Sequence, residues 1–261
     1  MDLDALLDAA VSAAHAGGQI VRDAFGRAHA VHAKGLPGDW VSETDTASER
    51  TVRAILTDAF PDIPVFGEEE GGERGALGWF VDPLDGTANF LHQFPIVGVS
   101  IALVEDGVPI VGVVHAPMLG DTFTAKRGGG AYVGGRLIEV STRPANEAIC
   151  ATGFPFRHNE RLDEYQPVLE RALVELEDLR RAGAASLDLA WTASGVFDGY
   201  FELALGPWDV GAGALLVREA GGIVTDWTGD DAAWLSSGDV VAAPPAMHER
   251  LLGIITELRN R

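Results

Sequence analysis

A series of short apolar runs separated by tight turns occupies residues 64–140 and constrains the fold more than any other feature. The runs VGVSIALVE and VPIVGVVHA have only Asp106-Gly107 between them, and such a two-residue connection is a strong signal for a β-hairpin. PVFG and GWFVD precede this pair, and TFTAKRG and AYVGGRLIEV follow it, with Gly134-Gly135 as another turn. Because a two-residue turn can join only antiparallel strands, this stretch predicts a largely antiparallel sheet.

Predicted helices flank these strands. Apolar residues at helical spacing indicate amphipathic helices over residues 3–28 and 46–59. Further strands alternate with helices that we expect at about 160–178, 186–195, 208–220 and 247–258. Because strand and helix do not repeat regularly, we expect a layered α/β fold with mixed or antiparallel sheets rather than a Rossmann fold.

Length and composition narrow the class of protein. The chain has 261 residues, 47% of them hydrophobic, and no repeat or linker divides it, so we expect a single domain with two lobes, roughly 1–145 and 146–261. No apolar run reaches the ~18 residues of a membrane span, and the start MDLDALLDAA is acidic where a secretory signal would be basic. Together with a single cysteine, Cys150, these features lead us to expect a cytoplasmic protein with no membrane partner.

The charge balance excludes one class of partner. The chain carries 39 acidic and 19 basic residues, for a formal net charge of −20. Binding to nucleic acid through phosphate neutralisation is therefore not expected. An anionic small molecule would need a local source of positive charge, such as metal ions or focused backbone amides.

The stretch WFVDPLDGTANF carries the first candidate site residues. Asp82 and Asp85 end a predicted strand, and Gly86-Thr87 opens a predicted short helix whose amides favour an anion. This arrangement offers carboxylates for a cation beside amides for a phosphate. Asp-Pro and Asp-Gly are also ordinary turn dipeptides, so the motif alone favours a plain turn, and a metal site requires further acids.

Other acids stand at comparable positions. Glu68 begins the run EEE after a predicted strand, and Asp209 and Asp45 stand where helices are predicted to begin. A solvated loop would explain Glu68, and helix N-capping would explain Asp209 and Asp45. Taken jointly, these acids supply the carboxylate oxygens that Mg²⁺ binds in proteins, often together with substrate phosphate.

Several other catalytic mechanisms lack their required motifs. The chain has no H-E-x-x-H, no G-x-S-x-G and no G-x-x-x-x-G-K-[ST], which excludes the usual zinc-protease, serine-hydrolase and P-loop patterns. Its histidines show no ligand spacing. The glycine-rich KRGGGAY is expected to form a hairpin rather than a phosphate loop.

Three motifs in order resemble one known family. GEE at 67–69, DPLDGTANF at 82–90 and WDVGAGALLVREAGG at 208–222 resemble the motifs of the inositol monophosphatase family, and the similarity extends over nearly the whole chain. The resemblance implies a five-layered αβαβα sandwich, a homodimer, and hydrolysis of a small phosphorylated polyol or sugar with two or three Mg²⁺ ions.

The resemblance also implies roles for matched positions. Glu68, Asp82 and the carbonyl of Leu84 would hold one Mg²⁺, Asp82, Asp85 and Asp209 a second, and a third would lie near Glu68 through waters. Thr87, hydrogen-bonded to Asp45, would orient the attacking water. The amides of Gly86 and Thr87 would hold phosphate, and Lys34 would lie on a loop that closes over the metals.

Substrate contacts follow from the same resemblance. Glu202 would bind a ring hydroxyl, and the backbone of Gly183, Ala184 and Ala185 would complete a polyol pocket that Asp85 and Asp209 also line. Ala184 departs from the serine or threonine common in the family and removes one hydroxyl donor. Inositol monophosphate is the expected substrate. The alternative substrates are fructose 1,6-bisphosphate, alone or with other sugar phosphates, and then histidinol phosphate or 3′-phosphoadenosine 5′-phosphate. A further alternative is that the chain is a regulatory binding protein without catalytic activity.

Overall fold

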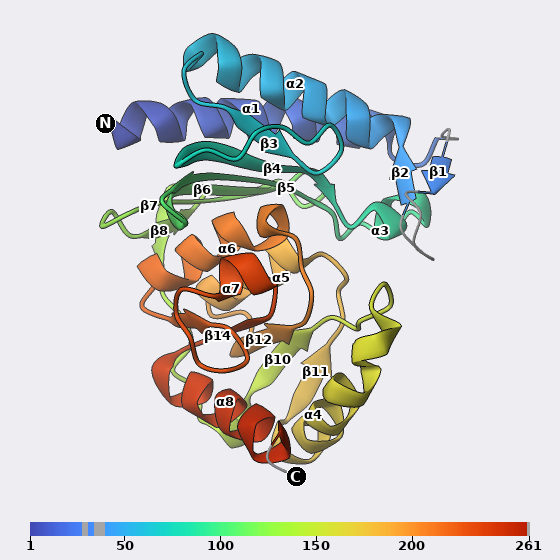
Figure 1. Cartoon of the computed structure of the whole chain (residues 1–261), viewed down its shortest axis with the longest axis vertical. Helices are drawn as coiled ribbons and strands as arrows, with labels where there is room; N and C mark the ends of the chain where they lie inside the picture. The colour runs from blue at the N-terminus through green and yellow to red at the C-terminus, as the bar shows by residue number, and fades with distance from the viewer. Residues whose placement is uncertain (28–30, 34–39, 260–261) are drawn as a thin grey trace.

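Three layers of helices alternate with two β-sheets in the computed structural model, which describes residues 1–27, 31–33 and 40–259 (Figure 1). The outer layers are α1 (Leu3–Ala24) with α2 (Glu43–Ala59), and α4 (Leu162–Glu175) with α8 (Pro245–Arg259). The central layer is α5 (Ala185–Ala193) with α6 (Pro207–Glu219). The predicted five-layered αβαβα sandwich is thus confirmed.

The first sheet has seven strands that lie side by side in chain order. They are β3 (Val65–Gly67), β4 (Leu77–Asp85), β5 (Gly98–Glu105), β6 (Val108–Ala116), β7 (Asp121–Lys126), β8 (Ala131–Val133) and β9 (Arg136–Ile138). Only β3 and β4 run parallel among these neighbours. Asp106 and Gly107 have φ values of 49° and 80°, as the tight β5–β6 turn requires, so the predicted hairpin is confirmed.

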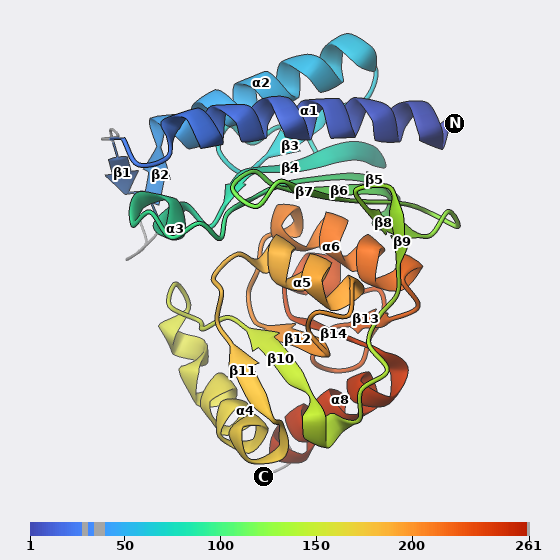
Figure 2. The same ribbon diagram turned by 180° about the vertical axis from the view of Figure 1, so that it is seen from behind.

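The second sheet is mixed and has the order β11-β10-β12-β14-β13, seen from behind in Figure 2. Its strands are β10 (Ile149–Thr152), β11 (Asp178–Arg180), β12 (Gly199–Glu202), β13 (Ile223–Thr225) and β14 (Val240–Ala243). The first three in the order run parallel, and the remaining pairs are antiparallel.

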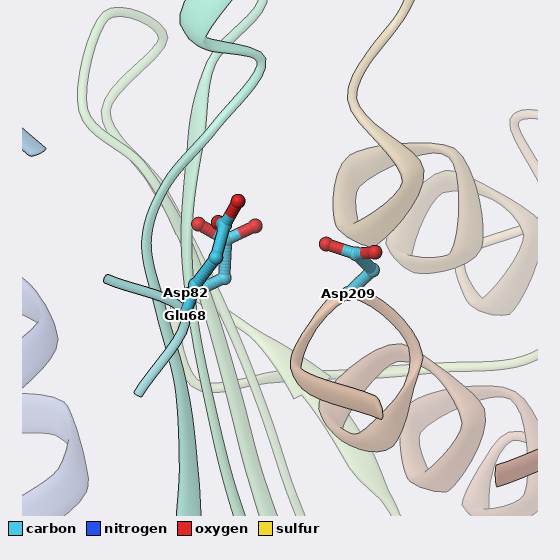
Figure 3. Close-up of side chains that lie close together, drawn as sticks. All are labelled: Glu68, Asp82 and Asp209. Carbon is cyan, nitrogen blue, oxygen red and sulfur yellow. The ribbon is translucent and has the colours of Figure 1, made fainter. Parts of the chain in front are cut away.

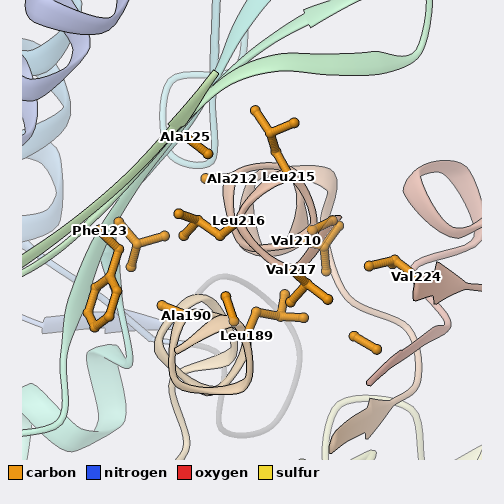
Figure 4. Close-up of a cluster of buried hydrophobic side chains, with 14 of the residues drawn as sticks. Phe123, Ala125, Leu189, Ala190, Val210, Ala212, Leu215, Leu216, Val217 and Val224 are labelled. Carbon is orange, nitrogen blue, oxygen red and sulfur yellow. The ribbon is translucent and has the colours of Figure 1, made fainter. Parts of the chain in front are cut away.

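Buried apolar side chains fill the spaces between the layers. The largest cluster surrounds α5 and α6 and joins side chains of both sheets, with Phe123 of β7 on one side and Val224 of β13 on the other (Figure 4). The small residues Ala212 and Ala214 of α6 are fully buried there. Because both sheets pack on the same two helices, residues at the ends of the first sheet and of α6 hold a defined relative position.

Several boundaries differ from the predictions. α1 ends at Ala24 rather than 28, and α2 begins at Glu43 with Ser42 as its N-cap. Asp45 is not the N-cap itself, but its carboxylate accepts the Ser42 amide and so completes a capping box at the start of α2. Before α2, β1 (Val31–Ala33) pairs antiparallel with β2 (Trp40–Ser42). Lys34 lies outside the described residues.

Two short α-helices and two 3₁₀ turns are also present in the described part of the chain. They are α3 (Thr87–Leu91), α7 (Trp234–Ser237), and the 3₁₀ turns at Ala145–Glu147 and Asn159–Arg161. In the described ranges, no helix combines the length and apolar character needed to cross a membrane.

Candidate active site

The end of β4 carries an irregularity that brings two acids to one side. Asp82 pairs with Ser100 of β5 and Asp85 pairs with Gly98, so three steps along β4 match two along β5. Residues three apart in a regular strand point to opposite faces, but an extra residue in the strand turns the second one to the same face. Pro83, which has no N–H for the ladder, lies inside this bulge.

Three carboxylates from different elements meet beside this bulge. Glu68 follows β3, Asp82 lies in β4, and Asp209 lies in the first turn of α6 (Figure 3). Each offers one oxygen, and these oxygens lie within 4.8 Å of one another. Mg²⁺ binds oxygen ligands at about 2.1 Å, so an ion between two of these acids would be within reach of both.

The carboxylates of the cluster repel one another. Burial raises the pKa of Asp82 well above its ordinary value, and the charges of Glu68, Asp85 and Asp209 raise it further. Burial also raises the pKa of Asp209, followed by the charges of Glu68 and Asp85. A bound divalent cation would remove this repulsion, so the charge and the oxygen chemistry of the site both fit Mg²⁺.

Asp85 accepts two hydrogen bonds from Ser186 at the start of α5. Its Oδ2 accepts hydrogen bonds from the Ser186 amide at 2.7 Å and the Ser186 hydroxyl at 2.5 Å. Burial raises the pKa of Asp85 to about 6, although both Ser186 bonds oppose the rise. The sequence did not predict a role for Ser186. The only feature that could have indicated one is its position in the first turn of the predicted helix.

Asp209 is the third residue of α6 and caps the helix from that position rather than as the N-cap residue. Its Oδ2 accepts a hydrogen bond from the Gly206 amide at 2.7 Å, which fixes the carboxylate at the helix start. Pro207 begins the helix, as is common at that position. One oxygen of Asp209 is thus anchored by its own helix while the side chain faces the acids of the first sheet (Figure 3).

Thr87 and Asp45 form a hydrogen-bonded pair at the edge of the cluster. Thr87 Oγ1 donates to Asp45 Oδ1 at 2.8 Å and lies 3.2 Å from the Leu84 carbonyl oxygen. Asp45 Oδ2 accepts from the Ser42 amide at 2.9 Å and the Ser42 hydroxyl at 2.5 Å. Burial raises the pKa of Asp45, while the bonds from Ser42 and Thr87 oppose the rise.

The loop that carries Glu68 is tied to α2 by a residue that the sequence reasoning missed. Glu49 is fully buried, and its carboxylate accepts bonds from the Glu69 and Glu70 amides at 2.7 and 3.0 Å. Arg53, one helical turn on, pairs with it at 2.8 Å. A Cβ on Gly67 would lie 2.2 Å from Glu49 Oε1, so glycine is required there. The Glu-x-x-x-Arg spacing was the available signal.

Gly86 brings the predicted phosphate and polyol segments together. Its φ of 90° is the left-handed conformation that glycine adopts readily, and it precedes α3. A Cβ on Gly86 would lie 3.4 Å from the Gly183 carbonyl oxygen and 3.5 Å from Ala184 Cβ. Ala184 and the adjacent Ala185 are buried beside this contact. The residues predicted to bind phosphate and alcohol are therefore neighbours.

Two more acids lie in this region, the half-buried Glu202 of β12 and the fully buried Asp188 of α5. Tyr200 donates a 2.5 Å hydrogen bond to Glu202, whose pKa burial raises to about 7. Asp188 of α5 is 1% exposed, and its Oδ1 has no hydrogen-bond partner among the described residues. Burial raises the pKa of Asp188, and the charges of Glu202 and Asp85 add to the rise. Asp188 was not predicted, because an acid within a helix pattern looks like a surface residue.

Comparison with known proteins gives consistent matches over the whole chain. A family model described as the inositol monophosphatase family matches residues 2–260. A putative Nus factor SuhB from Neisseria meningitidis serogroup B is 42% identical, over 97% of this chain and 99% of that protein. The Nus factor SuhB of Pseudomonas aeruginosa is 40% identical, over 96% of this chain and 95% of that protein.

Solved structures also match over nearly the whole chain. The extragenic suppressor protein suhB from Bartonella henselae superposes with a TM-score of 0.92 at 36% identity, covering 96% of this chain and 98% of that one. An IMPase from Thermotoga maritima superposes with a TM-score of 0.89 at 32% identity, covering 97% and 98%.

Proposed function

The chain belongs to the inositol monophosphatase family, and from this premise we propose that it is a Mg²⁺-dependent phosphomonoesterase that hydrolyses inositol monophosphate to inositol and phosphate. The observation that carries the proposal is the convergence of Glu68, Asp82 and Asp209 within 4.8 Å, from three separate elements. Because the chain has a net charge of −20, a phosphate ester needs a local source of positive charge to bind, and metal ions held by these acids would supply it.

The residues divide into metal ligands and groups that act on water and substrate. Glu68, Asp82 and the Leu84 carbonyl would hold one ion, Asp82, Asp85 and Asp209 a second, and a third would lie near Glu68. When bound, Mg²⁺ supplies charge neutralisation and a lowered pKa for water. The amides of Gly86 and Thr87 would hold phosphate oxygens.

Thr87 and Asp45 would position the attacking water. Thr87 Oγ1 directs its proton to Asp45 Oδ1, so its lone pairs remain available to accept a hydrogen bond from water. Asp45 would receive the proton as the water attacks. On the other side of the phosphorus, a water beside Asp209 would protonate the leaving alcohol oxygen, while Glu202 and the backbone of Gly183 to Ala185 orient the polyol. Lys34 would act on the loop over the metals.

Phosphate release from inositol 1-phosphate, measured with and without millimolar Mg²⁺, tests the proposal. We expect turnover only with Mg²⁺, and loss of turnover in Asp82→Asn but not in Asp58→Asn, which changes an exposed acid at the end of α2. Fructose 1,6-bisphosphate, histidinol phosphate and 3′-phosphoadenosine 5′-phosphate serve as parallel substrates. Absence of turnover with Mg²⁺ would contradict the proposal.

A second candidate role rests on the names of relatives. Proteins 40–42% identical to this chain are named Nus factor SuhB, so we propose as the alternative that the chain acts as a regulatory protein that binds transcription machinery. Genetic complementation with Asp82→Asn separates the roles. Full biological activity of this variant would favour the binding role, and loss of activity would favour catalysis.

The dimer that the family resemblance implies is also a proposal. Leu173 and Val174 of α4 are 63% and 79% exposed, which supplies apolar surface for a second copy. Analytical ultracentrifugation tests it, and a monomer at micromolar concentration would contradict it.

A further inference from the structure

Ser100 of β5 connects the first sheet to the start of α6. Its hydroxyl donates a hydrogen bond of 2.8 Å to the Trp208 carbonyl, across 108 residues of the chain. Ser100 is 0% exposed, so this bond lies in the interior of the protein. Trp208 is the second residue of α6 and directly precedes Asp209. The hydroxyl therefore holds the backbone next to one of the three clustered acids.

On its own sheet, Ser100 is the ladder partner of Asp82. Residues directly opposite each other in antiparallel strands carry their side chains on the same face, with Cβ atoms about 5 Å apart. The Ser100 hydroxyl and the Asp82 carboxylate thus both lie on the face of the sheet that α6 covers. Ser100 is therefore linked to Asp82 through the sheet and to Asp209 through the helix.

The first turns of α6 pack directly against β5 and β6. A Cβ on Gly211 would lie 3.0 Å from Ala102 Cβ, and a Cβ on Gly112 would lie 2.9 Å from the Ala212 carbonyl oxygen. These van der Waals contacts limit how closely the helix approaches the sheet, but they are not directional and restrict sliding along the strands only weakly. A hydrogen bond is directional, so Ser100 supplies the constraint that these contacts lack.

Other contacts of the cluster leave one distance undetermined. Glu49 ties the loop that carries Glu68, and the Gly206 amide fixes Asp209 to its own helix. Neither contact sets the distance from Asp209 to Asp82, because these two acids lie on different elements. Mg²⁺ requires nearly ideal octahedral geometry at about 2.1 Å, whereas Ca²⁺ accepts oxygens at about 2.3–2.6 Å in more variable arrangements. Selectivity between the two ions therefore depends on this distance.

We propose that Ser100 is a positioning residue for the metal centre: its bond to the Trp208 carbonyl sets the separation of Asp82 and Asp209 and thereby favours Mg²⁺ over the larger Ca²⁺. This inference rests on the proposed metal-dependent function and deepens it. Ser100 acts through the two acids and is not itself a ligand.

Direct ion binding to the metal-free protein tests the proposal. Isothermal titration calorimetry would give the affinities of the wild type, S100A, S100C and T225V for Mg²⁺ and for Ca²⁺. S100A should lower the Mg²⁺ affinity about tenfold and the Ca²⁺ affinity by less than about threefold, so the ratio of the two affinities should fall. S100C has a side chain of similar size with a weaker donor, so it should shift the ratio in the same direction by less.

T225V is the matched control. Thr225 of β13 is also buried, and its hydroxyl shares a 2.9 Å hydrogen bond with His248 of α8, in an outer layer of the fold. This variant should leave both ion affinities unchanged and lower the midpoint of urea denaturation, because the buried His248 loses a partner. S100A should keep the wild-type midpoint more nearly, because the Trp208 carbonyl retains its hydrogen bond within α6.

The outcomes separate this inference from the function on which it rests. An unchanged affinity ratio in S100A, or the same fall in T225V, would overturn the role of Ser100. If S100A fails to fold, as judged by circular dichroism, S100C decides, and a wild-type ratio in S100C would overturn the role as well. Absence of Mg²⁺ binding by the wild type would overturn the metal centre and this inference with it. Binding of Mg²⁺ without turnover of inositol 1-phosphate would overturn the proposed hydrolysis alone, because the affinity ratio is measured without substrate.

Discussion

Glu49 and Asp82 are both buried carboxylates, 0% and 1% exposed, yet their surroundings are opposite. Glu49 accepts hydrogen bonds from two backbone amides and pairs with Arg53. Asp82 accepts a hydrogen bond from the Leu84 amide at 2.9 Å and otherwise faces Glu68, Asp85 and Asp209. Among the described residues, Arg53 therefore neutralises the charge of Glu49, whereas Asp82 has one amide hydrogen bond and no cationic partner.

The difference indicates what each acid is for. Burying an ionised carboxylate costs several kcal/mol unless a cation and hydrogen bonds offset it. Arg53 and the amides supply that compensation at Glu49, so this acid stabilises the fold and fixes the loop of Glu68. At Asp82 the compensation must come from outside the chain, which is what a metal ligand requires.

Asp82→Asn should cause the largest loss of activity among the variants proposed. If it does not, the contrast between Glu49 and Asp82 fails. Replacing a metal ligand is expected to lower kcat/KM for inositol 1-phosphate by more than ~100-fold, since even outer partners of ligands are worth 10–100-fold. Without Mg²⁺, the free energy of unfolding should rise, because one of four mutually repelling carboxylates is removed. Urea denaturation of the metal-free protein measures this, and a marked loss of stability would show that Asp82 is structural.

Glu49→Ala should lower the stability of the fold, in contrast to Asp82→Asn, which should raise it in the absence of Mg²⁺. It leaves Arg53 and two backbone amides without their buried acceptor, so the free energy of unfolding should fall by about 3 kcal/mol. Glu43→Ala, an exposed acid on the same helix, is the control and should change stability by less than about 0.5 kcal/mol. Equal stability of the two variants in urea would remove the distinction between Glu49 and a surface acid.

Local sequence signals accounted for much of the fold. The Asp106-Gly107 turn determines the β5–β6 pairing, and apolar periodicity marks α1 and α2, because these features depend on neighbours in the chain. The family resemblance supplied the layer order and the candidate acids. Asp45 was expected at the start of its helix, but Ser42 provides the cap and Asp45 accepts bonds from it.

Contacts over long sequence distances could not be predicted in the same way. Ser186 reaches Asp85 across 101 residues, and Glu49 reaches the Glu69 amide across 20. The β4 bulge, which brings Asp82 and Asp85 to one face, depends on pairing with β5 rather than on a residue type. Asp188 is buried by packing of α5 between two sheets, and nothing in its local pattern distinguishes it from an exposed helix acid.

Ser186→Ala should have a smaller effect on activity than Asp82→Asn, because it changes a residue that holds a metal ligand rather than the ligand itself. It removes the hydroxyl donor to Asp85 but leaves the backbone amide, so Asp85 should become harder to ionise and apparent Mg²⁺ affinity should fall about tenfold. The Mg²⁺ dependence of phosphate release measures the change. Ser194→Ala, at the other end of α5, removes a hydroxyl bonded to the Trp191 carbonyl and should leave Mg²⁺ affinity unaltered. Equal shifts in both variants would indicate a general effect on α5.

The smallest expected effect is in the pH dependence of thermal stability. Burial and neighbouring carboxylates raise the pKa of Asp82 and Asp209, and burial raises that of Asp85 from 3.8 to about 6. Between pH 3.8 and about 6, Asp85 binds more protons in the folded state than in the unfolded state. The free energy of unfolding without Mg²⁺ should therefore fall as the pH rises through this range.

Protons and Mg²⁺ compete for the same carboxylates, so the rise in Tm on adding Mg²⁺ should be larger at pH 7.5 than at pH 5, by a few degrees. Differential scanning calorimetry of wild type and Asp82→Asn, each with and without Mg²⁺, measures both effects. The variant should show a shallower pH dependence and a smaller Mg²⁺ gain. An equal gain at both pH values in the wild type would mean that Mg²⁺ binds away from the acids whose pKa values are raised, and the contrast between Glu49 and Asp82 would then not identify the metal ligands.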